Sequence, residues 1–216
     1  MGVGSGVQIV LVDANVLSSR VLRDWLLQLC LETKGEMFDV RWTEDILAEA
    51  IKSIRRRHPE ISGGYISNVR DKIVEILPHG RIVDFQVTGA YQGSDPLDAH
   101  VHAAAESCGA NILLTENVKD FRKSGFEDLL PYEVYTADEF FVLIDDSAPH
   151  AVREVAFAQV QYYFEKHGDV DLCGPLVDAG AVAFADRVRQ RLHERSTDIE
   201  LLPRGPEGRI TPPARR

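Results

Sequence analysis

The sequence predicts an α/β protein, with a parallel β-sheet flanked by helices and followed by a C-terminal helical extension. Residues 7–12 form a nearly unbroken aliphatic run, which is typical of a strand buried on both faces of a parallel sheet. Strand patterns alternate with amphipathic segments of helical period as far as Asp146. Beyond that residue only helical periodicity continues, and this predicts the extension.

The expected elements follow one another in strand–helix order. Residues 16–33 carry apolar side chains at helical spacing, and residues 38–42 have the pattern of a short strand. Thr43 is typical of a helix N-cap, and Pro59 ends that helix. The further expected elements are a helix over residues 63–77, a strand over 82–87, a helix opened by Asp95 and closed by Gly109, strands over 111–115 and 134–136, and a helix opened by a capping box from Thr136 to Glu139.

These patterns divide the chain into three predicted sections. Residues 1–146 form the α/β domain, and residues 147–195 form a helical extension that packs on that domain or on a partner protein. The extension contains two helices, over residues 148–167 and 180–195, each with an apolar face. Residues 196–216 hold four prolines and four arginines, and we expect them to be disordered.

The composition is that of an ordinary globular protein. The 216 residues are 44% hydrophobic and 27% charged, and no apolar run is long enough to predict a membrane span. The N-terminal residues lack the basic and apolar regions of a secretory signal. Three isolated cysteines, none in a C-x-x-C pair, suit a reducing compartment and provide no zinc framework. We therefore expect a cytoplasmic protein without a membrane partner.

The charge distribution bears on nucleic-acid binding. The formal net charge of −10 argues against a nucleic-acid ligand. Between Ala50 and Arg81, however, seven basic residues stand against three acidic ones. The consecutive Arg55, Arg56 and Arg57 are candidates for RNA-phosphate contacts, for a patch facing a protein partner, or for a solvated helix surface.

Carboxylates are placed where a parallel sheet would gather them. Asp13 ends the first strand, Asp98 begins a helix, Glu116 and Asp120 follow the strand over residues 111–115, and Glu49 lies on the helix after Thr43. Residues at the carboxyl ends of parallel strands share one edge of the sheet. Acids held close together repel, which raises their pKa values and favours a neutralising cation. All-oxygen ligands select hard ions, so we expect Mg²⁺ or Mn²⁺ and phosphodiester hydrolysis.

Each acid also has an ordinary structural explanation. Asp13 has the position of a cap for the following helix, and Asp98 that of a first-turn acid. Glu49 and Asp120 are compatible with solvated surface positions. Sequence alone leaves these alternatives open for each acid taken separately.

Several stretches together are similar to one known family. They are residues 11–17 (LVDANVL), 44–50 (EDILAEA), 95–105 (DPLDAHVHAAA), 112–121 (ILLTENVKDF) and 135–140 (YTADEF). In this order and spacing they make the chain resemble PIN-domain proteins, in particular the VapC-type toxin ribonucleases of bacterial toxin–antitoxin pairs. The similarity covers about residues 7–145, so the resemblance implies a PIN-like nuclease domain in the first section.

The resemblance assigns expected roles to individual residues. Asp13, Glu49 and Asp98 match the core metal-binding, catalytic acids, and Asn15 matches the polar residue that often accompanies the first acid. Many members have aspartate where this chain has Asn117. Two acids are candidates for the fourth position: Asp120, as in the branch that reads Thr-x-Asn-x-x-Asp-Phe, and, as a weaker substitute, Glu116.

The function that the resemblance implies is a metal-dependent endoribonuclease, using Mg²⁺ or Mn²⁺ and acting as the toxin of a type II toxin–antitoxin pair. It also implies an RNA substrate, a cognate antitoxin protein and a possible homodimer. The extension after Asp146 has no counterpart in the compact toxins, so its role stays open.

Two other classes of function compete with this expectation. A catalytically degenerate PIN fold would bind RNA or protein without cleavage, and Asn117 in place of an acid favours it. A phosphotransferase of the haloacid dehalogenase type would also use Asp13, but it requires an acid two residues later, where this chain has Asn15. A receiver domain requires an aspartate at the end of a central strand other than the first, and none is found.

Overall fold

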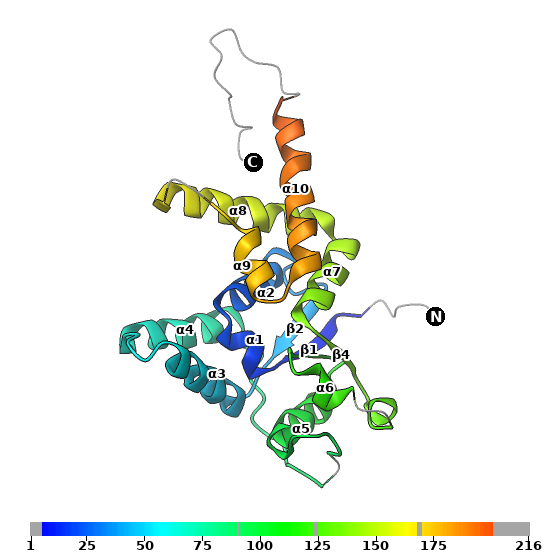
Figure 1. Cartoon of the computed structure of the whole chain (residues 1–216). Coiled ribbons are helices and arrows are strands. Elements are labelled where there is room, and N and C mark those ends of the chain that lie inside the picture. The colour runs from blue at the N-terminus through cyan, green and yellow to red at the C-terminus, as the bar shows by residue number, and fades with distance from the viewer. Residues whose placement is uncertain (1–5, 90, 123–124, 168–169, 201–216) are drawn as a thin grey trace.

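The computed structural model describes residues 6–89, 91–122, 125–167 and 170–200. At its centre lies a sheet of four parallel strands in the order β2-β1-β3-β4 (Figure 1). The strands are β1 (Gln8–Val12), β2 (Phe38–Arg41), β3 (Ile112–Leu114) and β4 (Glu133–Tyr135). The predicted α/β class with a parallel sheet flanked by helices is therefore confirmed.

Helices make up most of the rest of the described chain (Figure 1). They are α1 (Ala14–Ser18), α2 (Arg20–Glu32), α3 (Glu44–Arg57), α4 (Gly63–Ile76), α5 (Ala99–Cys108), α6 (Val118–Phe121), α7 (Ala137–Ser147), α8 (Pro149–His167), α9 (Cys173–Asp178) and α10 (Val182–Glu200), with 3-10 turns η1 (Pro96–Asp98) and η2 (Glu127–Leu129). No helix within the described ranges combines the length and apolar character needed to cross a lipid bilayer.

The helix ends follow the turn chemistry read from the sequence. The Thr43 hydroxyl accepts the amide of Ile46 at 3.1 Å and begins α3. Thr136 and Glu139 form a complete capping box at the start of α7. Gly109 ends α5 with φ of 62°, a left-handed conformation that glycine adopts without strain. These caps fix where α3 and α7 begin and where α5 ends.

One predicted strand does not form. A single parallel bridge, between Arg81 and Trp42, comes just before residues 82–87, and within that range Val83 and Val87 are exposed. The physical reason lies in the neighbouring chain: directly after Trp42, Thr43 turns the backbone into α3. Beyond Ile82, whose amide donates to the Trp42 carbonyl, no strand is left to pair with.

Two helix boundaries also differ from the prediction. The helix expected over residues 16–33 is divided, because Ser19 has an extended backbone (φ −79°, ψ 119°) between α1 and α2. At the other end of the chain, α10 continues to Glu200, past the expected end at residue 195. The remainder of the predicted tail, residues 201–216, lies outside the described residues.

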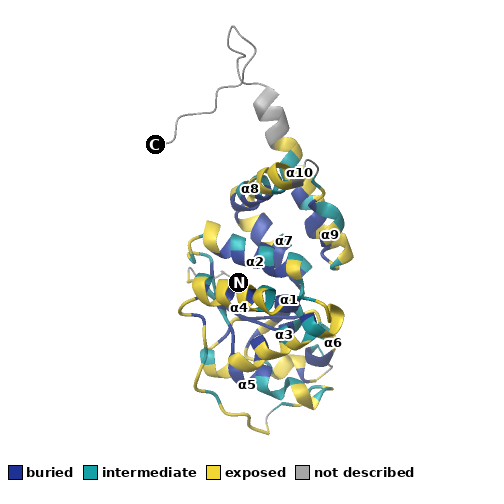
Figure 2. Ribbon diagram, turned by 90° about the vertical axis from the view of Figure 1, so that its left-hand side faces the viewer, coloured by how far each residue is buried: buried dark blue, intermediate teal, exposed yellow. Residues whose placement is uncertain are grey.

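The extension packs on the α/β body. Figure 2 shows α8, α9 and α10 stacked on the half that contains the sheet, with α2 and α7 between them. Phe184 of α10 is buried against Trp25 of α2 and Phe141 of α7, with ring centroids 4.9 and 5.0 Å apart. Aromatic side chains of this size contribute a large part of the burial energy of a core. One hydrophobic core therefore continues from the sheet into the extension.

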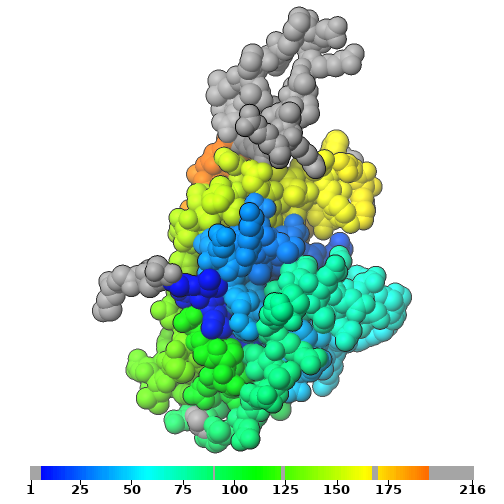
Figure 3. Space-filling model, turned by 180° about the vertical axis from the view of Figure 1, so that it is seen from behind, coloured from blue at the N-terminus to red at the C-terminus, as the bar shows by residue number. Residues whose placement is uncertain are grey.

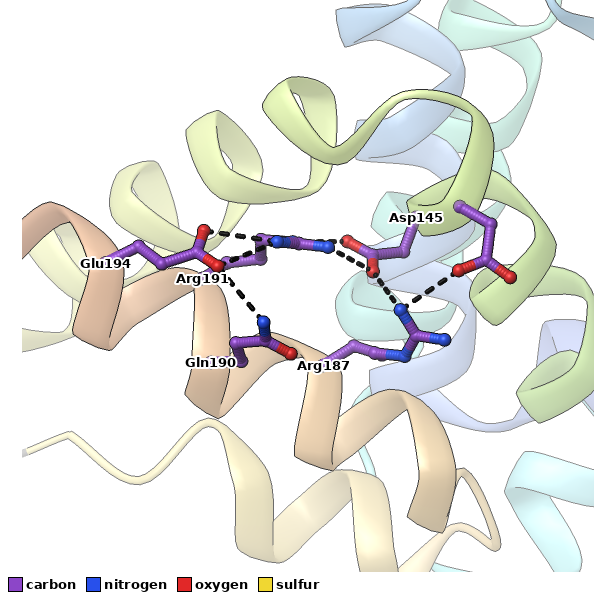
Figure 4. A network of polar contacts seen from close by, with 6 residues as sticks. Asp145, Arg187, Gln190, Arg191 and Glu194 are labelled. Atoms are coloured by element: carbon purple, nitrogen blue, oxygen red, sulfur yellow. Dashed lines mark hydrogen bonds and ion pairs between the residues drawn. The ribbon is translucent and has the colours of Figure 1, made fainter.

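A buried ion pair joins α7 to α10 (Figure 4). The Asp145 carboxylate is 0% exposed and accepts two hydrogen bonds from the Arg191 guanidinium, at 2.8 and 2.9 Å. Arg187 lies 3.3 Å from the same carboxylate and 2.9 Å from the exposed Asp146. Bidentate arginine–carboxylate pairs are both strong and geometrically specific, so this pair fixes how α10 lies on α7.

We predict that the Asp145→Ala substitution lowers the free energy of unfolding by about 3 kcal/mol, because it leaves the two arginines without their buried partner. The matched control is Asp146→Ala, which removes an exposed partner of Arg187 and should cost less than about 1 kcal/mol. Urea unfolding followed by circular dichroism measures both. Equal losses for the two variants would show that the buried pair does not hold the extension in place.

Candidate functional site

The candidate site begins at the carboxyl end of β1, with Asp13. Its side chain is 5% exposed and caps α1, with Oδ1 accepting the amide of Ala14 at 2.6 Å. Its own amide donates to the Leu114 carbonyl at 2.9 Å, which ties the end of β1 to the end of β3. Asp13 therefore does cap the following helix, as the sequence allowed. Its other carboxylate oxygen, Oδ2, faces the residues that follow β3.

Asn15 and Thr115 link the ends of the two strands. Both donate to Asp13 Oδ2 at 2.7 Å, from the Asn15 amide and the Thr115 hydroxyl. The Asn15 amide also donates to the Thr115 hydroxyl at 2.9 Å, and its oxygen accepts the Glu116 amide at 3.1 Å. The expected supporting role of Asn15 thus corresponds to a set of contacts that orient the Asp13 carboxylate.

Asn117 extends this network to two further acids. Its backbone amide donates to the Thr115 hydroxyl at 3.0 Å. Its side-chain amide donates to Asp98 Oδ2 at 3.3 Å and to Asp120 Oδ2 in a short contact. Asp98 stands at the end of η1, and Asp120 lies in α6. The structure therefore brings Asp13, Asp98 and Asp120 into one hydrogen-bonded group.

The acids influence one another electrostatically. Burial raises the pKa of Asp98 to about 7, with further contributions from Asp13, Asp95, Asp120 and Glu49. Burial also raises the pKa of Asp13, against the opposing effect of the hydrogen bond from Thr115. Negative charge is thus concentrated at this edge of the sheet, and Asp98 holds its proton more tightly than an ordinary aspartate does.

Glu49 lies at the margin of the group. Its side chain is 50% exposed, and Oε1 is 3.3 Å from Nε2 of His100. It makes no hydrogen bond to the other acids within the described residues, although it contributes to raising the pKa of both Asp13 and Asp98. It belongs to the rim of the site.

Glu116 turns away from the acids. Its Oε1 accepts the amide of Ala137 at 2.9 Å, at the first turn of α7. A carboxylate at this position stabilises the helix N-terminus. Between the two candidates for the fourth acid, Asp120 rather than Glu116 therefore lies beside Asp98.

The three arginines at the end of α3 make contacts of a different kind. Arg57 donates to the Ser18 carbonyl at 2.9 Å, and Arg55 donates to the Ile61 carbonyl in a short contact. Arg56 is exposed. These carbonyl contacts hold the end of α3 against its neighbours, and the expected contact with RNA stays a prediction.

Three functional candidates were missed from the sequence. Thr115 connects Asp13 to Asn117, and its place directly after β3 was the signal that could have identified it. His100, in the first turn of α5, lies 3.3 Å from Glu49. The hydroxyl of Tyr91 is buried with no hydrogen-bond partner in the described part of the chain. Burial raises the pKa of that phenol, and four aspartates, including Asp98 and Asp120, raise it further. Nothing in the loop sequence around Tyr91 indicated its approach to the acids.

The donor set suits a hard divalent ion in its chemistry. All its ligand atoms would be oxygens, from Asp13, Asp98, Asp120 and Glu49, and such sets select Mg²⁺ or Mn²⁺. Over the described ranges, no three His, Cys, Asp or Glu side chains are already arranged as a metal-binding group. The Asn117 amide donates to both Asp98 and Asp120, so it lies between two of the four candidate ligands.

Comparisons with known proteins give no relative. No family model, no curated protein and no solved structure matches this chain.

We predict a pH-dependent stability that arises from Asp98. Its pKa in the folded protein, about 7, lies above the ordinary aspartate value of 3.8, so the folded state binds the proton more tightly than the unfolded state. Without divalent ions, this contribution to stability is complete below about pH 4 and is lost as the pH rises through 7. Urea unfolding between pH 4.5 and 8, compared with Asp98→Asn, isolates it. Parallel pH profiles for the two proteins would contradict the raised pKa.

Proposed function

We propose that this protein is a metal-dependent endoribonuclease with a PIN-like fold. The observation that carries the proposal is the continuous hydrogen-bond network from Asp13 through Thr115 and Asn117 to Asp98 and Asp120. The network gathers three acids from separate parts of the sequence at one sheet edge. The motifs that resemble PIN-domain ribonucleases contain these same residues.

Asp13, Asp98 and Asp120 would hold Mg²⁺ or Mn²⁺, with Glu49 at the rim. When bound, such an ion supplies activation of water and stabilisation of the leaving oxygen in phosphodiester hydrolysis. Asn15 and Thr115 fix the orientation of the Asp13 carboxylate before any ligand arrives. Precise support of this kind for ligand side chains is what metal sites in proteins require.

The charge of the site also bears on RNA. Uncompensated acids would repel a phosphate backbone, since like charges across a binding surface oppose association. A bound ion would neutralise these acids and remove the repulsion, and it would favour the ionised form of Asp98, whose pKa is about 7 without it. RNA binding and ion binding are therefore expected to be coupled.

The biological setting follows from the sequence resemblance alone. On that basis we extend the proposal to the toxin of a type II toxin–antitoxin pair, with a cognate antitoxin protein as inhibitor and the possibility of a homodimer. Co-purification with the product of an adjacent gene, and relief of inhibition when that product is removed, test this part separately from the chemistry.

A second candidate function is a PIN-like fold that binds RNA or protein without cleaving. The contacts of Asn117 favour it, because its amide donates to Asp98 and Asp120 where many of the PIN-domain proteins that the sequence resembles have an aspartate. The two functions differ in one property: the nuclease requires a bound divalent ion, and the degenerate fold does not.

We predict that the full chain cleaves unstructured RNA in Mg²⁺ and that Asp13→Asn or Asp98→Asn lowers the rate by at least ~100-fold, because each removes a charge from the site. Gel analysis of a labelled single-stranded RNA measures the rate. Glu116→Gln is the matched control: its carboxylate faces α7, so its rate should stay within about twofold of the wild type. Cleavage at wild-type rates by both aspartate variants would place the activity elsewhere.

A further inference from the structure

A cleft of about 1070 Å³ opens between the α/β body and the extension. Its walls come from the start of α2, the end of α3, the start of α4, and α8 and α9. Figure 3 shows the blue surface of the early chain between the teal surface of α4 and the yellow surface of α8. None of the four acids of the candidate active site lines this cleft, so it is a separate feature.

The N-terminus of α2 faces the cleft without a cap. Ser19 and the first-turn residues Arg20 and Val21 line the cleft, and the Ser19 side chain makes no capping hydrogen bond. The first turn of this 13-residue helix contains no acid and instead carries Arg20 and Arg23. Cations at a helix N-terminus are unfavourable, because they face the positive end of the helix dipole. The two arginines and the positive end of the helix dipole therefore lie together, and this combination favours the binding of an anion.

Two buried donors in the same cleft have no acceptor. Gln159 of α8 is 6% exposed and Trp25 of α2 is 0% exposed, and both residues line the cleft. Neither Nε2 of Gln159 nor Nε1 of Trp25 has a hydrogen-bond partner in the described part of the chain. A buried donor without a partner costs stability. Trp25 is fully enclosed, so a ligand with acceptor atoms would satisfy the Gln159 amide alone.

Aromatic rings and a further arginine complete the walls. Tyr65 and Tyr163 line the cleft, and Arg20 donates to the Tyr163 hydroxyl at 3.4 Å. Arg57 also lines it and donates to the Ser18 carbonyl through one of its nitrogens. Flat aromatic walls with arginines are the usual means of holding a base and its phosphate.

The acids of the cleft are largely engaged by protein groups. Asp24 lies 3.7 Å from Arg20 and 3.9 Å from Arg23. Asp171 accepts the amides of Cys173 and Gly174 at the start of α9. Asp178 is the third acid of the lining, and Arg20, Arg23 and Arg57 are its three arginines.

We propose that this cleft binds a nucleotide. The phosphate lies at the N-terminus of α2 beside Arg20 and Arg57, and the base lies against α8, with an acceptor facing the Gln159 amide. The volume exceeds what a phosphate ion needs and lies at the upper limit of the range for sites of small organic ligands. The nucleotide is either free or a residue of an RNA strand. The binding does not depend on the proposed nuclease activity.

The test measures binding of the four ribonucleoside 5′-monophosphates, one at a time, to the full chain by isothermal titration calorimetry in EDTA. We expect at least one to bind with Kd below ~1 mM, with inorganic phosphate at least ~10-fold weaker. A short RNA oligonucleotide forms the second arm: binding of the oligonucleotide alone assigns the nucleotide to a strand. No binding in either arm, or equal affinity for inorganic phosphate, overturns the proposal.

Variants assign the binding to the cleft. Gln159→Leu removes the unpaired amide and should weaken nucleotide binding at least ~10-fold, while raising the melting temperature of the free protein, since a buried unsatisfied donor is lost. Gln161→Leu, an exposed position on the same helix, is the matched control and should bind as the wild type does. Unchanged affinity in Gln159→Leu contradicts the proposal. If Gln159→Leu does not fold, Arg20→Gln, a substitution at an exposed position, replaces it in the test and should weaken nucleotide binding. Unchanged nucleotide affinity in Arg20→Gln would also contradict the proposal.

One further variant separates this proposal from the nuclease. Asp98→Asn should bind the nucleotide with wild-type affinity, because Asp98 does not line the cleft. Loss of RNA cleavage with retained nucleotide binding supports both proposals. Loss of nucleotide binding in Asp98→Asn would instead place the ligand at the acids and overturn the assignment to the cleft.

Discussion

The parallel register of β1 and β3 is the constraint on which the candidate site depends. Val12 pairs with Leu114, so the next residues, Asp13 and Thr115, leave the sheet side by side. Their hydrogen bond at 2.7 Å fixes the Asp13 carboxylate, and the Asn117 amide then carries the network to Asp98 and Asp120. A slip of the register by one residue would reverse the faces of the strand and separate the acids.

Much of this site could be predicted because its causes are local or follow from topology. Asp13 lies at the end of a buried strand, and the predicted parallel sheet brought that end next to the residues after β3. The caps at Thr43 and Thr136 needed only their own side chains and the next turn. What could not be predicted is orientation. Glu116 turns to α7 because an unpaired amide at Ala137 is within reach, and this depends on how α7 packs.

The failed predictions share a dependence on neighbours distant in sequence. Residues 82–87 have a strand pattern, yet β2 ends too early to pair with them. The helix breaks at Ser19 without a glycine or proline that would predict the break. The break leaves the start of α2 open to the cleft. That cleft exists because the extension packs over α2 through Phe184 and is held on α7 by the Asp145 ion pair. Local pattern alone carries no information about these contacts.

Diffraction from crystals soaked in Mn²⁺, recorded with anomalous scattering, tests the central claim most directly, because it locates and counts the ions at once. The account predicts a strong anomalous peak coordinated by carboxylate oxygens of both Asp13 and Asp98, with the Asn117 amide moved off the acids. An Mn²⁺-soaked crystal with no peak between these carboxylates, and with Asn117 still hydrogen-bonded to Asp98 and Asp120, would contradict it.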